Sequence, residues 1–174
     1  MEIRIACHAD LDSIEAIYDG ILTQEEQQGH SYTNWQRGVY PTRQDAEAVL
    51  AEGSLYVGEE NGQIAAAVIL NHRQLPEYSD IRWEYPAKGD EVLVIHTLVI
   101  HPQAAGHGLG RQFVTFAEET ARAKGCKVLR LDTYEGNTPA ASLYRKLGYR
   151  YAGVTKFNFH GILENLILFE KQME

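Results

Sequence analysis

A strand, a glycine-rich turn and a helix follow one another in the middle of the chain, and this succession constrains the fold more than any other feature. Asp90–Ile100 is an apolar run typical of a strand, and three glycines lie within five residues from Gly106 onwards. Apolar residues at helical spacing predict a helix over Gly108–Lys124, and Lys127–Asp132 predicts a further strand. A unit of strand, crossover helix and parallel strand presents its ligand at the carboxyl ends of the strands, so we expect a binding site beside the glycine turn.

The turn itself is typical of a phosphate site, because glycine lets a ligand approach the main chain and a helix N-terminus favours an anion. A P-loop would need Gly-Lys-Ser/Thr, whereas the chain reads Gly-Arg-Gln from Gly110. The dinucleotide fingerprint G-x-G-x-x-G is not met either, because the third glycine comes one residue early. The pattern Gln-x-x-Gly-x-Gly is matched by Gln103, Gly106 and Gly108. A turn that merely caps the helix is the plain alternative.

The other segments predict a mixed sheet in place of a doubly wound parallel one. An Asn-Gly pair at Asn61-Gly62 joins two of the strands as a hairpin. Thr23–Tyr40 carries aromatic residues without a clear period, and it either packs in the core or lines a substrate pocket. We expect one domain over residues 1–174. Its other strands are expected at Glu2–Cys7, Leu55–Glu59, Gln63–Leu70, Tyr149–Phe159 and Leu163–Lys171, and its other helices after caps at Asp10, Thr42 and Asn137 or Thr138.

Composition narrows the possible partners. The formal net charge is −8 and no cluster of Lys and Arg occurs, so we expect no nucleic-acid partner, whose phosphates need a basic stripe. No apolar run approaches the roughly 20 residues that span a bilayer, so no membrane association is expected. Cys7 and Cys126 lie far apart without metal-binding spacing, which argues against a disulfide framework or a metal site and favours a reducing, cytoplasmic setting.

Two stretches, VIHTLVIHPQAAGHGLGRQF and NTPAASLYRKLGY, resemble the GNAT superfamily of N-acetyltransferases. The first is similar to the family's fourth strand and its acetyl-CoA pyrophosphate loop, and the second to the following motif with its Asn and Tyr. The opening IRIACHADLDSI is also similar to the family's first strand and helix, so the resemblance covers most of the chain. It implies a GNAT-like α/β fold, a mixed and mostly antiparallel twisted sheet with helices on both faces and one parallel strand pair splayed at the acetyl-CoA site.

The resemblance further implies that acetyl-CoA binds as the acetyl donor. The backbones of Leu98 and Val99 would pair with the pantetheine arm as an added strand does. Charge-assisted hydrogen bonds from the turn, worth about 1.5 to 3 kcal/mol each, would hold the pyrophosphate without a lysine. Family members often carry Arg or Lys at Ala105, so His107 or Arg111 would have to reach the 3′-phosphate. The implied cofactor-binding residues are Leu98, Val99, Gln103, Ala104, Ala105, Gly106, His107, Gly108, Leu109, Gly110, Arg111, Asn137, Ala140 and Tyr144.

Catalytic roles follow from the same resemblance and from the chemistry of acyl transfer. Asn137 and Tyr144 are seven residues apart, two turns of a helix, so both can face one groove. In the family they contact the pantetheine and the thioester sulfur, and a tyrosine hydroxyl near sulfur can protonate the departing thiolate.

An amine acceptor must also lose a proton, because with a pKa near 10.4 only on the order of one molecule in a thousand is neutral at pH 7. The candidate bases are Glu84, set between two aromatic residues, and His96, on the strand just before Leu98. Asp80 and Asp132 are further candidates, and for Asp132 a structural role at the end of its strand is expected instead.

The sequence therefore predicts an N-acetyltransferase that moves an acetyl group from acetyl-CoA to a primary amine by direct attack in a ternary complex. The amine could belong to a small molecule or to a protein or peptide, and a homodimer is possible. The alternative is a non-catalytic acyl-CoA-binding or sensing module, which would keep the pyrophosphate loop but need no route for a proton.

Overall fold

The computed structural model describes residues 1–174 and contains every strand and helix predicted from the sequence. The first part of Thr23–Tyr40 completes helix α1, and a bridge between Gln36 and Tyr40 closes a turn in its second part. None of the helices is long and apolar enough to cross a membrane. The elements are β1 Glu2–Ile5, α1 Leu11–Gln28, α2 Arg43–Ala51, β2 Leu55–Glu60, β3 Gln63–Asn71, β4 Val92–Ile100, α3 Leu109–Ala123, β5 Val128–Tyr134, α4 Thr138–Lys146, β6 Arg150–Phe159 and β7 Ile162–Gln172, with short 3-10 helices that include η2 Pro76–Asp80 and η4 Pro102–Ala104.

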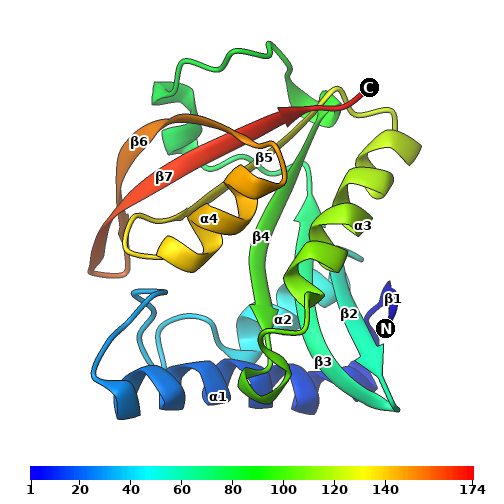
Figure 1. The fold of residues 1–174 in the computed structure, drawn as a ribbon, viewed down its shortest axis with the longest axis vertical. Helices are drawn as coiled ribbons and strands as arrows, with labels where there is room; N and C mark the ends of the chain where they lie inside the picture. The colour runs from blue at the N-terminus through cyan, green and yellow to red at the C-terminus, as the bar shows by residue number, and fades with distance from the viewer. The chain divides into compact units, whose positions relative to one another are not determined.

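The seven strands form one mixed sheet in the order β1-β2-β3-β4-β5-β7-β6 (Figure 1). Strands β4 and β5 run parallel and α3 connects them along the chain, whereas β5 with β7 and β6 with β7 are antiparallel. The pairing of β4 with β5 extends from Val92 and Val128 to Ile95 and Leu131, although both strands continue beyond these residues. The predicted mixed, mostly antiparallel sheet with one parallel pair is confirmed.

The chain divides into two compact units, and β4 contributes to both. The first unit consists of Met1–Ser31, Trp35–Leu70 and Thr97–Phe116, and the second of the remaining residues. The single domain expected over residues 1–174 stays a prediction.

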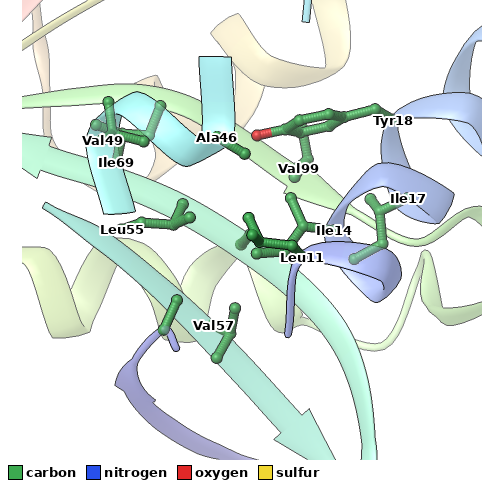
Figure 2. Close-up of a cluster of buried hydrophobic side chains, with 12 residues drawn as sticks. Leu11, Ile14, Ile17, Tyr18, Ala46, Val49, Leu55, Val57, Ile69 and Val99 are labelled. Carbon is green, nitrogen blue, oxygen red and sulfur yellow. The ribbon is translucent and has the colours of Figure 1, made fainter. Parts of the chain in front are cut away.

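In the first unit, helices cover both faces of β2. Leu55 and Val57 belong to a buried cluster that α1 and α2 build with β2 and β3 (Figure 2). The alternate residue Tyr56 instead packs its ring edge-on against Phe116 of α3, with the ring centroids 5.3 Å apart. Because successive side chains of a strand point to opposite faces, α3 lies across β2 from α1 and α2, as the predicted fold class requires.

The second unit is built around β7. On one face, Leu166 and Leu168 are buried with Val92 and Val94 of β4 and with Tyr78 from η2. On the other face, the ring of Phe169 lies 5.9 Å from that of Tyr144 in α4. A cluster of apolar side chains on the η2 face and an aromatic cluster under α4 therefore hold this unit together.

Local sequence signals explain two of the turns. Thr42 caps α2 by accepting a hydrogen bond from the backbone N–H of Asp45, whose carboxylate accepts in return from the Thr42 N–H at 2.7 Å. This reciprocal pair is the predicted capping box. Asn61 and Gly62 both have positive φ, 53° and 75°, as the two central residues of a tight hairpin turn require.

The start of α1 differs in detail from the prediction. Asp10 precedes the helix, but its side chain makes no capping bond to it. The carboxylate turns back instead, accepting from the Cys7 N–H at 2.8 Å and from the Arg4 guanidinium at 2.8 and 2.9 Å. A charged partner outcompetes the helix because hydrogen bonds between ionised groups are the stronger ones.

The prediction that Asp132 closes its strand is wrong. Strand β5 continues to Tyr134 because its pairing with β7 continues, with Asp132 opposite Leu168 and Tyr134 opposite Leu166. Asp132 is therefore a carboxylate inside a paired strand.

Gly58 tests the packing of α3 on β2. A Cβ at this position would lie 2.7 Å from the ring of Phe113, which is fully buried, and 2.6 Å from the Met1 sulfur. We expect Gly58→Ala to lower the free energy of unfolding by about 1 to 3 kcal/mol, the usual cost of overpacking. Gly20→Ala is the matched control, since its Cβ would meet Pro102 no closer than 3.4 Å and alanine favours a helix. Denaturant titration measures both, and equal stability of the two variants would contradict the packing described.

Candidate active site

The predicted phosphate loop follows β4 in the first unit and leads directly into α3. Its first residue, His101, is tied to β3 by a bond from its N–H to the carbonyl of Ala65 at 2.8 Å. Gly106 and Gly108 have φ values of 83° and 77°, which side chains rarely adopt, and a Cβ at either would meet no atom within 4 Å. Backbone conformation, not crowding, is therefore the reason for glycine at both positions.

Only some of the backbone N–H groups in this loop are available to a phosphate. The amides of Gln103, Ala104 and Ala105 are used inside the η4 turn, where they bond His101 Nδ1, the His101 carbonyl and the Pro102 carbonyl. The first helical bond of α3 runs from the Gln112 N–H to the carbonyl of Gly108. The N–H groups from residue 106 to residue 111 therefore remain as donors at the start of α3, because the first N–H groups of a helix lack partners within it, and such a helix end favours an anion.

Strand β4 changes conformation at Thr97, just before the two residues predicted to pair with pantetheine. Thr97 has a φ of 46°, a left-handed conformation that is strained for a β-branched residue. Its hydroxyl is hydrogen-bonded to that of Tyr40. Beyond it, Leu98 is partly exposed, whereas Val99 is buried in the α1–α2 cluster.

Helix α4 carries the second predicted motif, in the second unit. The Asn137 side chain caps the helix, its Oδ1 accepting from the Ala140 N–H at 3.2 Å, so its amide nitrogen remains as a donor. Tyr144 is buried, and its ring packs edge-on against Tyr149 with the centroids 5.6 Å apart. Burial, with a further contribution from the charge of Asp132, raises the pKa of Tyr144 well above its ordinary value. Its hydroxyl therefore stays protonated and can act as a donor.

Glu84 lies in the segment that joins β3 to β4, residues 72–91, which we call the β3–β4 connection. Its backbone N–H donates to the buried carboxylate of Glu170 at 2.7 Å. Its own carboxylate is 61% exposed and lies 3.8 Å from Arg150 Nη2. The main chain of Glu84 is thus held, while its side chain faces solvent and a cation.

His96 is the last residue of β4 that belongs to the second unit. Its Nε2 lies 2.9 Å from Oδ1 of Asn71, and that same oxygen accepts a bond from the Arg73 N–H at 2.9 Å. The oxygen is therefore an acceptor, so Nε2 carries the proton of the neutral ring. Burial lowers the pKa of His96 to about 4.

Asp132 interacts electrostatically with Glu77 and Glu164, two acids that were not assigned to the site from the sequence. The Tyr78 hydroxyl donates to Oδ2 of Asp132 at 2.6 Å. Burial raises the pKa of Asp132 to about 6, an effect that the Tyr78 bond opposes and the charge of Glu77 increases. Glu164 of β7 has its pKa raised to about 7, first by burial and also by the charge of Asp132, while a bond from Asn34 opposes the shift.

One signal for partners of Asp132 was present in the sequence. In Leu129-Arg130-Leu131-Asp132 the leucines alternate with charged residues, which places Arg130 and Asp132 on the same face of a central strand. Charged residues are rarely buried unless they are paired, so two of them on an inner face indicate partners from another segment. No comparable pattern pointed to Tyr78, which reaches the strand only through the β3–β4 connection.

A family model for the acetyltransferase (GNAT) family matches residues 14–149, and the chain belongs to that family. The uncharacterized N-acetyltransferase YesJ of Bacillus subtilis (strain 168) is 28% identical over 133 residues, 74% of this chain and 67% of YesJ. An acetyltransferase of the GNAT family from Streptococcus agalactiae 2603 has a TM-score of 0.82 at 23% identity, covering 99% of this chain and 95% of that one. The yncA protein of Salmonella typhimurium, solved with its cofactor acetyl-CoA, has a TM-score of 0.72 at 20% identity, covering 100% and 94%.

The predicted family and cofactor are thereby confirmed. GNAT acetyltransferases use acetyl-CoA as acetyl donor, and the cofactor is present in one of the similar structures. The assignment of individual residues to the cofactor and to catalysis stays a prediction for this chain.

Gly108→Glu tests the loop. A carboxylate at the N-terminus of α3 opposes the helix dipole and fills the space of a pyrophosphate, so we expect acetyl-CoA binding to weaken at least about 100-fold, the loss of one or two charge-assisted hydrogen bonds. Gly62→Glu is the matched control, because Gly62 has φ +75° and an equally open environment at the β2–β3 turn. Isothermal titration with acetyl-CoA should separate the two. Equal affinity in both folded variants would remove the loop from the site.

Proposed function

We propose that the protein is an acetyl-CoA-dependent N-acetyltransferase whose acceptor is a primary amine, attacking the thioester directly in a ternary complex. The observation that carries the proposal is the state of Tyr144, a buried phenol kept protonated by its surroundings. A thiolate leaving group needs such a donor, because protonation by a positioned acid is typically worth about 100-fold to 10,000-fold in rate. In a module that only binds acyl-CoA, the same ring would serve for packing alone.

Within this proposal the cofactor is held by backbone groups more than by charged side chains. The N–H groups of residues 106–111 bind the pyrophosphate, and the backbones of Leu98 and Val99 pair with the pantetheine arm. The free amide nitrogen of Asn137 donates to the same arm. The exposed side chains of His107 and Arg111 are the candidates for the 3′-phosphate, since Ala105 offers no charge. A cytoplasmic location is part of the proposal and is supported by the two free thiols of Cys7 and Cys126.

The experiment that tests the proposal measures release of the CoA thiol from acetyl-CoA against a panel of amines. The panel should contain polyamines, amino acids, amino-bearing antibiotics and peptide N-termini, with acetyl-CoA alone as the background. Turnover with at least one amine, and a product mass increased by one acetyl group on nitrogen, supports the enzyme. Tight binding of acetyl-CoA without turnover on any amine would favour the acyl-CoA-binding module instead.

Tyr144→Phe separates chemistry from binding. If the hydroxyl interacts with sulfur mainly as negative charge develops there, its loss lowers the turnover number more than it weakens acetyl-CoA binding. We expect turnover to fall at least about tenfold, with the cofactor dissociation constant within a few-fold of wild type. The phenylalanine keeps the ring contacts with Tyr149 and Phe169.

Tyr149→Phe is the control for this experiment, because Tyr149 is also buried and packs directly on Tyr144. The turnover number of this variant, measured by steady-state kinetics on the best amine of the panel, should stay within about twofold of wild type, the scale of a merely structural change. Equal turnover in the Tyr144 variant and in wild type would assign Tyr144 to packing alone.

A further inference from the structure

We propose that Asp132 is the residue that takes the proton from the acceptor amine, and that Tyr78 is the positioning residue that holds its carboxylate. The inference rests on the proposed function and names the base that it requires, in place of Glu84 and His96.

The position of Asp132 in the sheet is the first argument. The parallel pairing of β4 with β5 ends at Ile95 and Leu131, so His96 and Asp132 are the first residues of the two strands beyond it. Successive side chains of a strand alternate between faces, so Asp132 shares the face of its antiparallel partner Leu168. A carboxylate thus stands where two parallel strands cease to pair, the place at which such a unit presents its ligand.

The second argument is the pair of oxygens on Asp132. Oδ2 accepts the hydroxyl of Tyr78 at 2.6 Å, and the structure gives Asp132 no other hydrogen bond. Oδ1 is therefore open to accept a proton. Tyr78 is itself fixed, because it is buried, its ring lies 5.5 Å from that of Trp83, and its carbonyl accepts the Trp83 indole N–H at 3.0 Å.

The third argument is the environment. Tyr78 and Glu77 from η2 act on Asp132, which itself acts on Tyr144 from α4 and Glu164 from β7. Arg130, two residues before Asp132 on β5, is the cation that acts on Tyr78. Oε2 of Glu77 is buried and has no hydrogen-bond partner. A buried carboxylate with a negatively charged neighbour favours a cation such as an ammonium group beside it. Burial, with a further contribution from the charge of Glu77, raises the pKa of Asp132 to about 6, closer to that of the amine than the pKa of an ordinary aspartate.

The two bases expected from the sequence are less suited to the task. The carboxylate of Glu84 is exposed to solvent and already forms an ion pair with Arg150. The Nε2 of His96 already carries a proton shared with Asn71, and its pKa near 4 makes the ring a weak base.

In the proposed step, the ammonium gives one proton to Oδ1 of Asp132, and the freed lone pair of nitrogen forms a bond with the acetyl carbon. The carbon–sulfur bond breaks and its electron pair leaves on sulfur. Tyr144 delivers a proton to that sulfur and regains one from the nitrogen, which must lose a second proton to become a neutral amide. Asp132 passes its proton to solvent, so the balance is amide, CoA thiol and one released proton.

The test is the pH dependence of kcat/KM on an amine that the wild type acetylates, corrected for the free-base fraction of that amine. The base works when it is deprotonated, so wild-type kcat/KM should fall as pH decreases through about 6. Asp132→Asn should lower kcat/KM at pH 7 at least about 100-fold and abolish this acid limb. The dissociation constant of acetyl-CoA should stay within a few-fold of wild type.

Two further variants move the same limb in opposite directions, and they keep the proposal falsifiable if Asp132→Asn does not fold. Tyr78→Phe removes a bond that stabilises the ionised carboxylate, so the limb should move to higher pH. Glu77→Gln removes a neighbouring negative charge, so the limb should move to lower pH. A purely structural role would lower activity without these opposite shifts. Glu119→Gln, an exposed acid on α3, is the control that should leave the profile unchanged.

The outcomes distinguish this inference from the proposed function. A wild type without turnover on any amine overturns the proposed function. A wild type with turnover, combined with an Asp132→Asn variant that keeps the acid limb, overturns only the role of Asp132. If Glu164→Gln abolishes the limb while Asp132→Asn keeps it, Glu164 is the base and the proposal is wrong.

Discussion

A pair of buried charges on adjacent strands determines how the β3–β4 connection lies on the second unit. Arg130 of β5 and Glu170 of β7 are opposite each other in the register, and neither has more than 3% of its surface exposed. Arg130 donates to Gln74 and to the carbonyl of Tyr85, while Glu170 accepts from the N–H of Glu84 at 2.7 Å. Because buried charges are costly unless they are hydrogen-bonded, the connection is required to fold back over the strands.

The β3–β4 connection also joins Arg130 to Asp132 through two aromatic side chains. The guanidinium of Arg130 also lies 4.1 Å from the ring centroid of Trp83, which in turn contacts Tyr78. Tyr78 then reaches Asp132, two residues along β5 from Arg130. Arg130 and Asp132 therefore share one strand face, and the β3–β4 connection supplies hydrogen-bond partners to both.

Much of the fold could be predicted because its signals are local. The capping box at Thr42, the Asn61-Gly62 turn and the glycines before α3 each act through backbone geometry within a few residues. The conformation of the loop before α3 belongs to the same class, since it follows from consecutive residues of the backbone. The surroundings of Asp132 could not be predicted, because its hydrogen-bond partner Tyr78 is 54 positions away in a connection without periodicity. The alternation of Asp132 with Leu131 predicts the face of β5 on which Asp132 lies, but it does not predict that Tyr78 is the hydrogen-bond partner.

Strand β4 belongs to both compact units, and the division between them falls at Thr97, the strained residue. Glycine or asparagine would adopt its left-handed conformation at lower cost, yet neither offers a hydroxyl on a branched side chain to Tyr40. The position of the loop that contains Tyr40 and the course of the central strand therefore depend on each other through this bond. A residue at position 97 without the hydroxyl would release β4 from Tyr40, so one side-chain contact fixes the path of the strand at the residue where the two units divide.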